Sequence, residues 1–379
     1  MNLDFAPLEG ITGAAFRRLH HRYFPGVDRY YTPFLSPTKE HLLTPREQRE
    51  LLPEYNTGIT VVPQILTKVP ADFLWAAELL HGMGYREVNL NAGCPSGTVT
   101  AKGKGSGMLA DLETLRKFLD AVYEAAPCPI SVKTRLGLED PEEFGPILEI
   151  YNQYPILELI IHPRVRKDFY RHPVRMEAFE KALAVSKNPV SYNGGIVTPE
   201  DYARCAERFP HVKSLMSGQG LVSDPFLAAR IKNGTGSDRD VLRAFHDELF
   251  EIYAAQFGSR VNAAKRMKDL WFYLIRLFED SERHGKKILK AKTPEEYELA
   301  ASAVFRELPL LDRSAGGWRR FSLISDRLSY IIVKNGKGAI PWIPSTKPCL
   351  RRGKSAMWRS KTVSSCVPWA VRLCLAGSN

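Results

Sequence analysis

Short apolar segments alternate strictly with amphipathic segments over residues 1–235. The apolar segments predict eight β-strands, at 3–7, 29–34, 60–66, 87–91, 130–135, 157–162, 190–193 and 212–217. Apolar residues at three- and four-residue spacing predict helices between them, at 14–23, 71–83, 112–125, 142–154, 176–187 and 199–209. The link between the second and third strands has the weakest helix signal. Eight strands with crossover helices predict a (β/α)8 TIM barrel, because a doubly wound sheet normally has fewer strands and a glycine-rich first turn.

A second helical region, residues 236–311, follows the barrel pattern. Its clearest helix carries an apolar stripe formed by Met267, Leu270, Trp271, Leu274, Leu277 and Phe278. We therefore expect an α-helical bundle domain after the barrel.

The charge is unevenly distributed along the chain. The net charge is +11, but residues 1–311 hold equal numbers of basic and acidic residues, so the whole excess lies in residues 312–379. This tail has 13 Lys and Arg against Asp312 and Asp326, and four of the six Trp. It is either a basic, aromatic RNA-binding arm or an appended segment without a selected fold. We favour the second, since its Trp, Cys and β-branched content is unlike that of a solvated basic arm.

Several classes of protein do not fit the sequence. No run of about 18 apolar residues occurs, which argues against a membrane span. The first residues lack the pattern of a signal peptide, so we expect a cytoplasmic protein without disulfides. The spacings typical of zinc sites, P-loops and nucleophile elbows are missing as well. We expect a monomer that binds no metal.

Polar residues and glycines follow most of the predicted strands. In a TIM barrel the carboxyl ends of the strands form the active face, so these residues are expected to converge there. Each alone has an ordinary explanation, such as a solvated lysine or a glycine turn. The group consists of Pro7, Gln64, Asn89, Asn91, Lys133, Arg135, His162, Arg164, Asn193, Gly194, Gly195, Gly218 and Gln219.

The last two loops predict a phosphate site. Gly194-Gly195 and Gly218-Gln219-Gly220 permit close backbone approach, and a short helix at 226–231 follows. Across the mouth, Gln64 and Lys133 offer hydrogen bonds and positive charge to an electron-rich ring. Flavin mononucleotide (FMN) fits both ends, and glycine turns without a ligand are the alternative.

Cys94 is the candidate reactive group. It follows the fourth strand in Gly93-Cys94-Pro95, on the active face, whereas a buried free cysteine is usually inert packing. Lys102 lies on the next glycine-rich loop, which is long enough to fold over a substrate.

The motifs together resemble those of the tRNA-dihydrouridine synthases, over about residues 3–310. The motifs that carry the resemblance are Ala6-Pro7-Leu8-Glu9-Gly10-Ile11-Thr12, Asn89-Leu90-Asn91-Ala92-Gly93-Cys94-Pro95, Lys133-Thr134-Arg135-Leu136-Gly137, His162-Pro163-Arg164 and Asn193-Gly194-Gly195.

This resemblance implies a flavin barrel at 1–235 that reduces the 5,6 double bond of a tRNA uridine, with NADPH reducing FMN, and a tRNA-binding helical domain at 236–311. Cys94 would be the general acid. The residues expected around FMN are Pro7, Leu8, Glu9, Gln64, Lys133, His162, Asn193, Gly194, Gly195, Gly218 and Gln219. The residues expected to contact tRNA are Asn89, Asn91, Lys102, Arg135, Arg164, Lys265 and Arg266.

The chain departs from the usual family pattern at two site residues. Gln219 replaces an arginine that would contact the flavin phosphate, and Gly195 replaces an aspartate near the ribityl chain. The tail after Leu311 matches nothing in the family pattern.

Two other functions stay open. A flavin barrel acting on a free pyrimidine, as a dihydroorotate-type dehydrogenase does, would share the cofactor loops but would not need residues 240–310. A non-catalytic RNA-binding protein on a decayed flavin barrel is suggested by Gln219 and Gly195. The acid-free basic stretches 260–268 and 283–292 are either RNA contacts or a solvated face.

Overall fold

The computed structural model describes residues 1–311 of the chain. The predicted tail, residues 312–379, lies outside the described residues.

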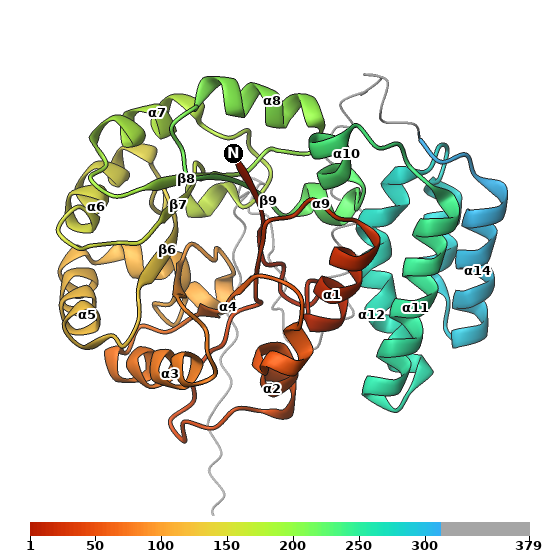
Figure 1. The fold of residues 1–379 in the computed structure, drawn as a ribbon, viewed down its shortest axis with the longest axis horizontal. Helices are drawn as coiled ribbons and strands as arrows, with labels where there is room; N and C mark the ends of the chain where they lie inside the picture. Colours follow the sequence, from red (N-terminus) through yellow and green to blue (C-terminus); the bar gives the residue numbers. More distant parts are fainter. Residues whose placement is uncertain (312–379) are drawn as a thin grey trace, which may run out of the picture. The chain divides into compact units, whose positions relative to one another are not determined.

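Nine parallel strands form one sheet that curves into a barrel (Figure 1). Their order in the sheet is β3-β2-β1-β9-β8-β7-β6-β5-β4. Since β3 and β4 follow one another directly in the chain, the two ends of this order meet. The predicted TIM barrel is confirmed. The strands are β1 (Asn2–Phe5), β2 (Arg29–Tyr31), β3 (Val61–Val62), β4 (Gln64–Ile65), β5 (Val88–Ala92), β6 (Ile130–Arg135), β7 (Leu159–His162), β8 (Val190–Asn193) and β9 (Ser214–Ser217).

The single strand predicted at 60–66 is divided into β3 and β4 by Pro63. Proline has no N–H to donate, so the ladder breaks there, although the Pro63 carbonyl still accepts from Asn89 N–H at 2.8 Å. The Leu35 N–H continues the pairing by donating to the Gln64 carbonyl at 2.8 Å. The two short strands β3 and β4 therefore occupy together the place of one of the eight strands of the barrel.

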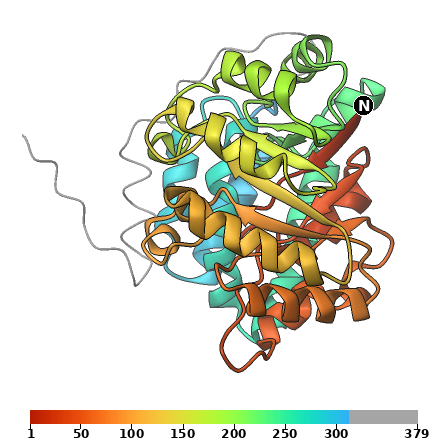
Figure 2. The same ribbon diagram turned by 90° about the vertical axis from the view of Figure 1, so that its left-hand side faces the viewer.

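Helices α3, α5, α6, α7 and α8 lie outside the ring of strands (Figures 1 and 2). The helices predicted at 14–23 and 112–125 have the bounds of α1 and α5, whereas α6 is shorter than its prediction of 142–154. The bounds in the barrel are α1 (Ala14–Tyr23), α2 (Pro45–Leu51), α3 (Pro70–Gly82), α4 (Gly97–Thr100), α5 (Leu112–Ala125), α6 (Phe144–Tyr151), α7 (Met176–Val185), α8 (Pro199–Arg208), α9 (Gln219–Ser223) and α10 (Leu227–Asn233).

Helix α2 occupies the link whose helix signal was weakest. It begins with a capping box, in which the Thr44 side chain accepts from Glu47 N–H and the Glu47 carboxylate accepts from Thr44 N–H, and Pro45 fits its first turn. Local capping thus defines a helix that has little apolar periodicity.

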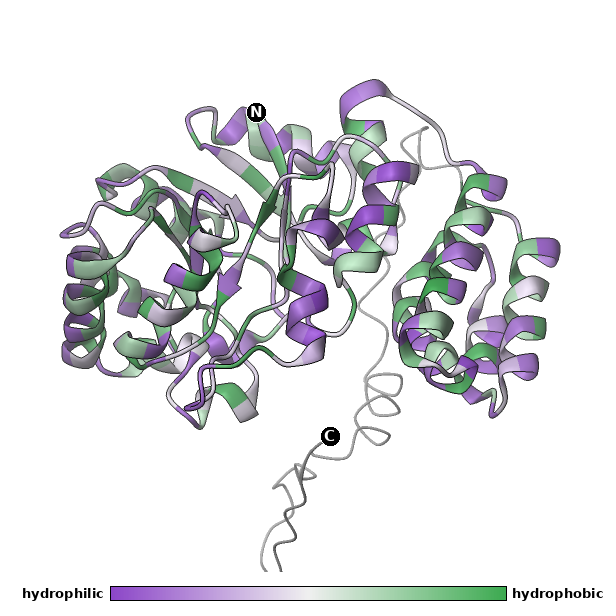
Figure 3. Ribbon diagram, turned by 60° about the horizontal axis from the view of Figure 1, so that its bottom comes forward, coloured by the Kyte–Doolittle hydropathy of each residue, from purple (hydrophilic) through white to green (hydrophobic). Residues whose placement is uncertain are grey.

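The remaining helices form a bundle whose apolar residues mostly face inward (Figure 3). They are α11 (Arg239–Phe257), α12 (Arg260–Leu274), α13 (Glu282–Lys290) and α14 (Pro294–Glu307). Phe245 of α11 packs edge-on against Phe16 and Phe24, with ring centroids 5.7 and 5.0 Å apart. The bundle therefore shares one hydrophobic cluster with α1 and β1. The predicted domain boundary at 235/236 stays a prediction.

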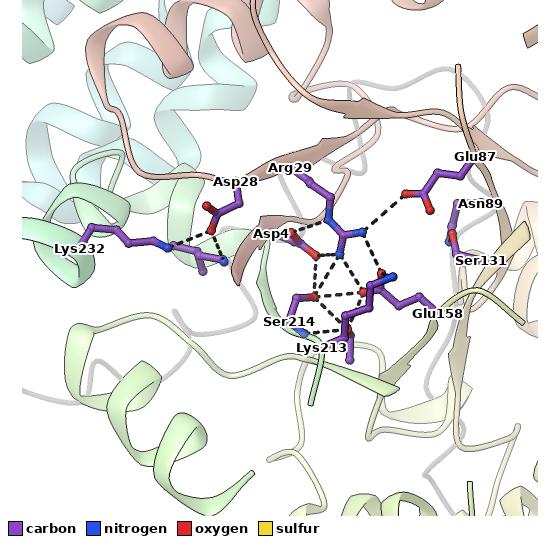
Figure 4. Close-up of polar contacts among 12 residues, drawn as sticks. Asp4, Asp28, Arg29, Glu87, Asn89, Ser131, Glu158, Lys213, Ser214 and Lys232 are labelled. Carbon is purple, nitrogen blue, oxygen red and sulfur yellow. Dashed lines mark hydrogen bonds and ion pairs between the residues drawn. The ribbon is translucent and has the colours of Figure 1, made fainter. Parts of the chain in front are cut away.

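A network of buried charges fills the amino end of the barrel (Figure 4). The Arg29 guanidinium lies between the carboxylates of Asp4 and Glu158, donating from Nε to Asp4 Oδ1 at 3.1 Å and from Nη1 to Glu158 Oε2 at 2.8 Å. Ser214 links both carboxylates, and Lys213 Nζ lies 3.2 Å from Glu158. This network anchors four strands at the end of the barrel opposite the candidate site.

Candidate active site

Strand register brings the predicted polar residues together at the carboxyl ends of β4 to β7. Gln64 pairs with Asn89, Asn91 with Lys133, and Arg135 with His162. Neighbouring residues of parallel strands at the same height point the same way, so these six side chains share one face of the barrel mouth. The convergence expected from the sequence is present for these residues.

Three amides form a buried chain across β4 and β5. Gln64 Nε2 donates to Asn89 Oδ1 at 2.8 Å, and Asn91 Nδ2 donates to Gln64 Oε1 at 2.7 Å. Asn89 Nδ2 donates in turn to Ser131 Oγ at 2.9 Å. Gln64 and Asn89 are fully buried. The hydrogen bonds with Asn89 and Asn91 fix the orientation of the Gln64 amide, which keeps one N–H and one oxygen lone pair for a ligand.

The backbone on both sides of Cys94 is held by hydrogen bonds. Asn91 Oδ1 accepts from the N–H groups of Gly93 and Cys94, at 3.1 and 2.9 Å. The Cys94 carbonyl accepts from Ser106 N–H and Ser106 Oγ, at 3.1 and 2.9 Å. The thiol therefore projects from a fixed loop.

The Cys94 thiol is half-buried and stays protonated at neutral pH. Burial raises its pKa above the ordinary value of 9.0, against the opposing effects of a Ser96 backbone hydrogen bond and the positive charges of Arg135 and Lys133. A protonated thiol at the active face is suited to donate a proton rather than to act as a nucleophile.

Lys133 lies half-buried next to this thiol, at the register position of Asn91. Burial and the nearby charge of Arg135 lower its pKa to about 7. Among residues 1–311, no hydrogen bond or ion pair engages its ammonium group. An anionic or electron-rich ligand could therefore serve as the partner of the Lys133 ammonium group.

Arg135 supports the loops of the site from below. It is 1% exposed, and it donates to the carbonyls of Gly93, Val165 and Phe169 at 2.9, 3.1 and 3.0 Å. These contacts join the Cys94 loop to the loop after β7. With its guanidinium buried and bound to three carbonyls, Arg135 does not fit the contact to tRNA that the sequence analysis predicts.

His162 is neutral and its tautomer is fixed. Arg164 Nη1 donates to His162 Nε2 at 2.8 Å, so the ring proton resides on Nδ1. Burial lowers the pKa of His162 well below its ordinary value, and the charges of Arg135, Lys133 and Arg164 act in the same direction. Arg164 also donates from Nε to the His172 carbonyl at 2.7 Å. The imidazole can therefore donate one hydrogen bond from Nδ1.

Two glycines in the loops after β8 and β9 lie close against neighbouring side chains. Gly194 has φ +127°, and a Cβ there would lie 2.9 Å from His162 Cδ2. A Cβ on Gly218 would lie 3.0 Å from Leu8 Cδ1. The Asn193 amide donates to the Met216 carbonyl at 2.9 Å, which ties the two loops together. Without side chains at these two positions the backbone of both loops can approach a ligand closely, although the Gly194 N–H itself donates to the Met216 carbonyl at 3.4 Å.

Four predicted site residues have other surroundings. Glu9 is exposed and forms an ion pair with Arg46. Lys102 and Lys265 are exposed, as a contact with tRNA requires. Their contact with tRNA stays a prediction. Arg266 is half-buried and donates to the Gly10 carbonyl, so it joins α12 to the loop after β1.

Sequence reasoning missed two features of the site. Ser106 positions the Cys94 carbonyl through a glycine-rich loop whose fold could not be deduced from spacing. The aromatic residues Phe169 and Tyr170 are 44% and 45% exposed beside the mouth, and Phe169 has an unusual positive φ of 48°. Two adjacent aromatic residues in a polar loop were the available signal.

Residues 1–311 contain neither a recognisable metal site nor a helix suited to span a membrane. No cluster of three or more His, Cys, Asp or Glu side chains is arranged to hold a metal ion there. Within the same residues no helix has both the length and the apolar character needed to cross a membrane.

Comparison with known proteins gives consistent matches to enzymes of one kind. Residues 4–301 match the family model described as dihydrouridine synthase. The chain is 31% identical over 233 residues to a probable tRNA-dihydrouridine synthase 1 of Synechocystis, an alignment that spans 60% of this chain and 63% of that protein. It is 29% identical over 239 residues to a tRNA-dihydrouridine(16) synthase of Pseudomonas putida, covering 61% and 73% of the two chains.

Other relatives and structures are more distant. A tRNA-dihydrouridine synthase B of Vibrio cholerae is 27% identical over 69% of this chain and 83% of its own. Among solved structures, a morphinone reductase aligns over 62% of this chain and 86% of its own with a TM-score of 0.45 and 11% identity. The family model covers most of the described residues, including every strand from β2 to β9, and on this match the chain belongs to the dihydrouridine synthase family.

Proposed function

We propose that this protein is a tRNA-dihydrouridine synthase that uses FMN and NADPH and that protonates the uracil ring with Cys94. The observation that carries the proposal is the half-buried Cys94 thiol on a loop held by backbone hydrogen bonds, beside Lys133 at the barrel mouth, in a chain of this family.

The residues at the mouth fit FMN. The loops at Gly194 and Gly218 would let the backbone come close to a phosphate, because neither residue carries a side chain, although the Gly194 N–H already donates to the Met216 carbonyl at 3.4 Å. Lys133 and the free N–H of Gln64 would face the ring, where a positive charge favours electron-rich atoms. A negative ligand would raise the pKa of Lys133 from about 7 and keep the amine charged. Bound flavin supplies the hydride that uridine reduction requires.

Cys94 would complete the reduction by giving its proton to carbon 5. Hydride addition at carbon 6 leaves an electron pair delocalised from carbon 5 onto the neighbouring carbonyl. The pair takes the thiol proton, a new C–H bond forms, and the thiolate regains a proton from solvent. The raised pKa of Cys94 keeps the proton in place until it is needed.

The chain would act on a uridine that has left its stack. A base inside a folded tRNA cannot reach a thiol at the mouth of a barrel, so it must be extruded onto the active face. Asn91 and the Nδ1–H of His162 are polar groups at that face, and exposed Lys102 and Lys265 are candidates for contacts to tRNA phosphates.

The rival functions have less support. A dehydrogenase for a free pyrimidine would not need the bundle of α11 to α14, which is part of the matched family region. A non-catalytic RNA-binding protein would not need a half-buried thiol on a loop whose backbone is held by four hydrogen bonds. We retain NADPH, cytoplasmic location and a monomeric state as predictions.

Mass mapping of dihydrouridine in tRNA tests the proposal. tRNA from a strain lacking this gene should lose dihydrouridine at defined positions, and the wild-type gene should restore it. The Cys94→Ala gene should fail to restore it, with protein levels as the control. The proposal would be rejected if tRNA from the deletion strain, in a background without a second synthase gene, kept the wild-type content of dihydrouridine.

A further inference from the structure

A small cavity lies between the barrel and the bundle, beside the mouth. It has a volume of about 100 Å3. It is lined by the loop after β1, by α2 and by the end of α11, and we call it the arginine cavity. Its polar lining residues are Arg46, Arg49, Glu50, Tyr253, Gln256 and Arg266.

The arginine cavity adjoins the candidate active site. Gly10 and Ile11 in its wall directly follow Glu9, and the charge of Glu9 reaches the Cys94 thiol. Arg46 pairs with Glu9 at the rim. A group bound in the cavity would therefore lie next to whatever occupies the mouth.

Most of the charged groups around the cavity already have partners. Arg266 donates to the Gly10 carbonyl. The Glu50 carboxylate accepts from Ala14 N–H at 2.8 Å and from the fully buried Arg17 at 3.1 Å. These contacts fix the walls of the cavity and neutralise its one lining carboxylate.

Two lining side chains have no such partner. Among residues 1–311, Arg49 and Gln256 take part in no hydrogen bond or ion pair, although both are half-buried. Arg49 lies three residues after Arg46 on α2, so the two guanidinium groups share one helix face. An unpaired guanidinium and a primary amide, with two further arginines nearby, favour an anion with several acceptor oxygens.

The size of the cavity restricts the ligand further. Pockets that enclose drug-sized molecules measure roughly 300–1,000 Å3, so this one is too small for a nucleoside or a dinucleotide. A single phosphate group fits. We propose that the arginine cavity binds an RNA backbone phosphate next to the extruded uridine, with Arg49 as its main contact and Gln256 as a second. This inference rests on the proposed function, because it takes tRNA as the substrate.

Binding of dihydrouridine-free tRNA to the full-length protein tests the inference. Arg49→Gln should weaken binding about 10-fold, since a charge-assisted hydrogen bond is lost. It should also reduce the slope of log affinity against log salt by about 0.7–0.9, the value for one phosphate contact. Arg49→Lys should keep the wild-type slope. Gln256→Glu should weaken binding independently by placing a negative charge in the cavity.

Arg86→Gln is the matched control. Arg86 is exposed and precedes β5 at the opposite end of the barrel, so its loss changes the net charge equally but should leave affinity and slope unchanged. Wild-type affinity and slope in Arg49→Gln would overturn the inference. So would unchanged tRNA affinity with a raised KM for NADPH in flavin reduction, because the cavity would then serve the dinucleotide.

The proposed function is tested by a different measurement, the formation of dihydrouridine by the wild-type protein. If the wild-type protein forms dihydrouridine while Arg49→Gln and Gln256→Glu bind tRNA normally, only the cavity inference is wrong. If the wild-type protein forms no dihydrouridine, the proposed function is wrong, and the salt slopes still decide whether the cavity holds a phosphate.

Discussion

Replacing Arg29 with methionine removes the central cation of the network at the amino end of the barrel. Arg29 donates to Asp4 and Glu158, whose side chains are both fully buried. Methionine keeps an apolar stem of similar length but none of the N–H donors. Asp4 would retain Ser214 as its hydrogen-bond donor, and Glu158 would retain Ser191, Ser214 and Lys213.

The expected loss of stability follows from these contacts. Removing one member of a buried ion pair costs about 3–5 kcal/mol, because a charge is left without compensation. Asp4 is the more vulnerable partner, since burial raises its pKa above 3.8 even in the presence of Arg29. Glu158 has more donors, and their hydrogen bonds, together with those from Arg29, outweigh burial and lower its pKa below 4.5. We expect Arg29→Met to lower the free energy of unfolding by about 3–5 kcal/mol at pH 8.

The loss should depend on pH in a defined direction. In the wild type the lowered pKa of Glu158 gives a stabilisation that is present above pH 4.5 and is lost as pH falls through the folded-state pKa. In the variant, burial without Arg29 raises the pKa of both carboxyl groups, so the variant loses stability as pH rises through those values. The difference between wild type and variant should therefore grow from pH 4.5 to pH 8.

Urea unfolding followed by circular dichroism at several pH values measures this difference. Lys213→Met is the control, because Lys213 is partly exposed and contacts only Glu158 in this network, and its loss should cost about 1 kcal/mol or less. A difference below about 1 kcal/mol at pH 8 for Arg29→Met, or one that does not change with pH, would refute the reasoning.

Three further predictions concern the reaction. Cys94→Ala should slow single-turnover uridine reduction about 10²–10⁴-fold and spare flavin reduction by NADPH; a wild-type rate would show that the proton comes from another group. Gln219→Arg should raise FMN occupancy of the purified protein by adding a charge-assisted contact at the start of α9, and unchanged or lower flavin absorbance would show that the phosphate lies elsewhere. Truncation after Leu311 should leave uridine reduction intact; loss of tRNA affinity with retained flavin would identify the tail as an RNA arm.

The sequence predicts the barrel well because its signals are local. Apolar periodicity and capping are properties of short segments, and the strands at 130–135 and 190–193 have the predicted bounds. The exceptions have local causes too. Pro63 divides one strand, and α2 depends on the capping of Thr44 rather than on an apolar face.

The contacts of the site could not be deduced in the same way. That polar residues gather at one face follows from the fold, but the burial of Arg135 depends on three carbonyls up to 42 residues away. The network of Asp4 with Ser214 joins residues 210 apart. Such partners are chosen by the closure of the barrel, and no spacing rule for a single segment contains them.

The aromatic contact between α1 and α11 has a consequence for target choice. Because Phe245 is packed among Phe16 and Phe24 inside one continuous cluster, any movement of the bundle relative to the barrel would have to break these apolar contacts. For an enzyme of the proposed kind, this packing would favour one distance between the bundle and the Cys94 thiol. If the bundle contacts tRNA as proposed, a change of target position would then favour new surface side chains over a movement of the two parts.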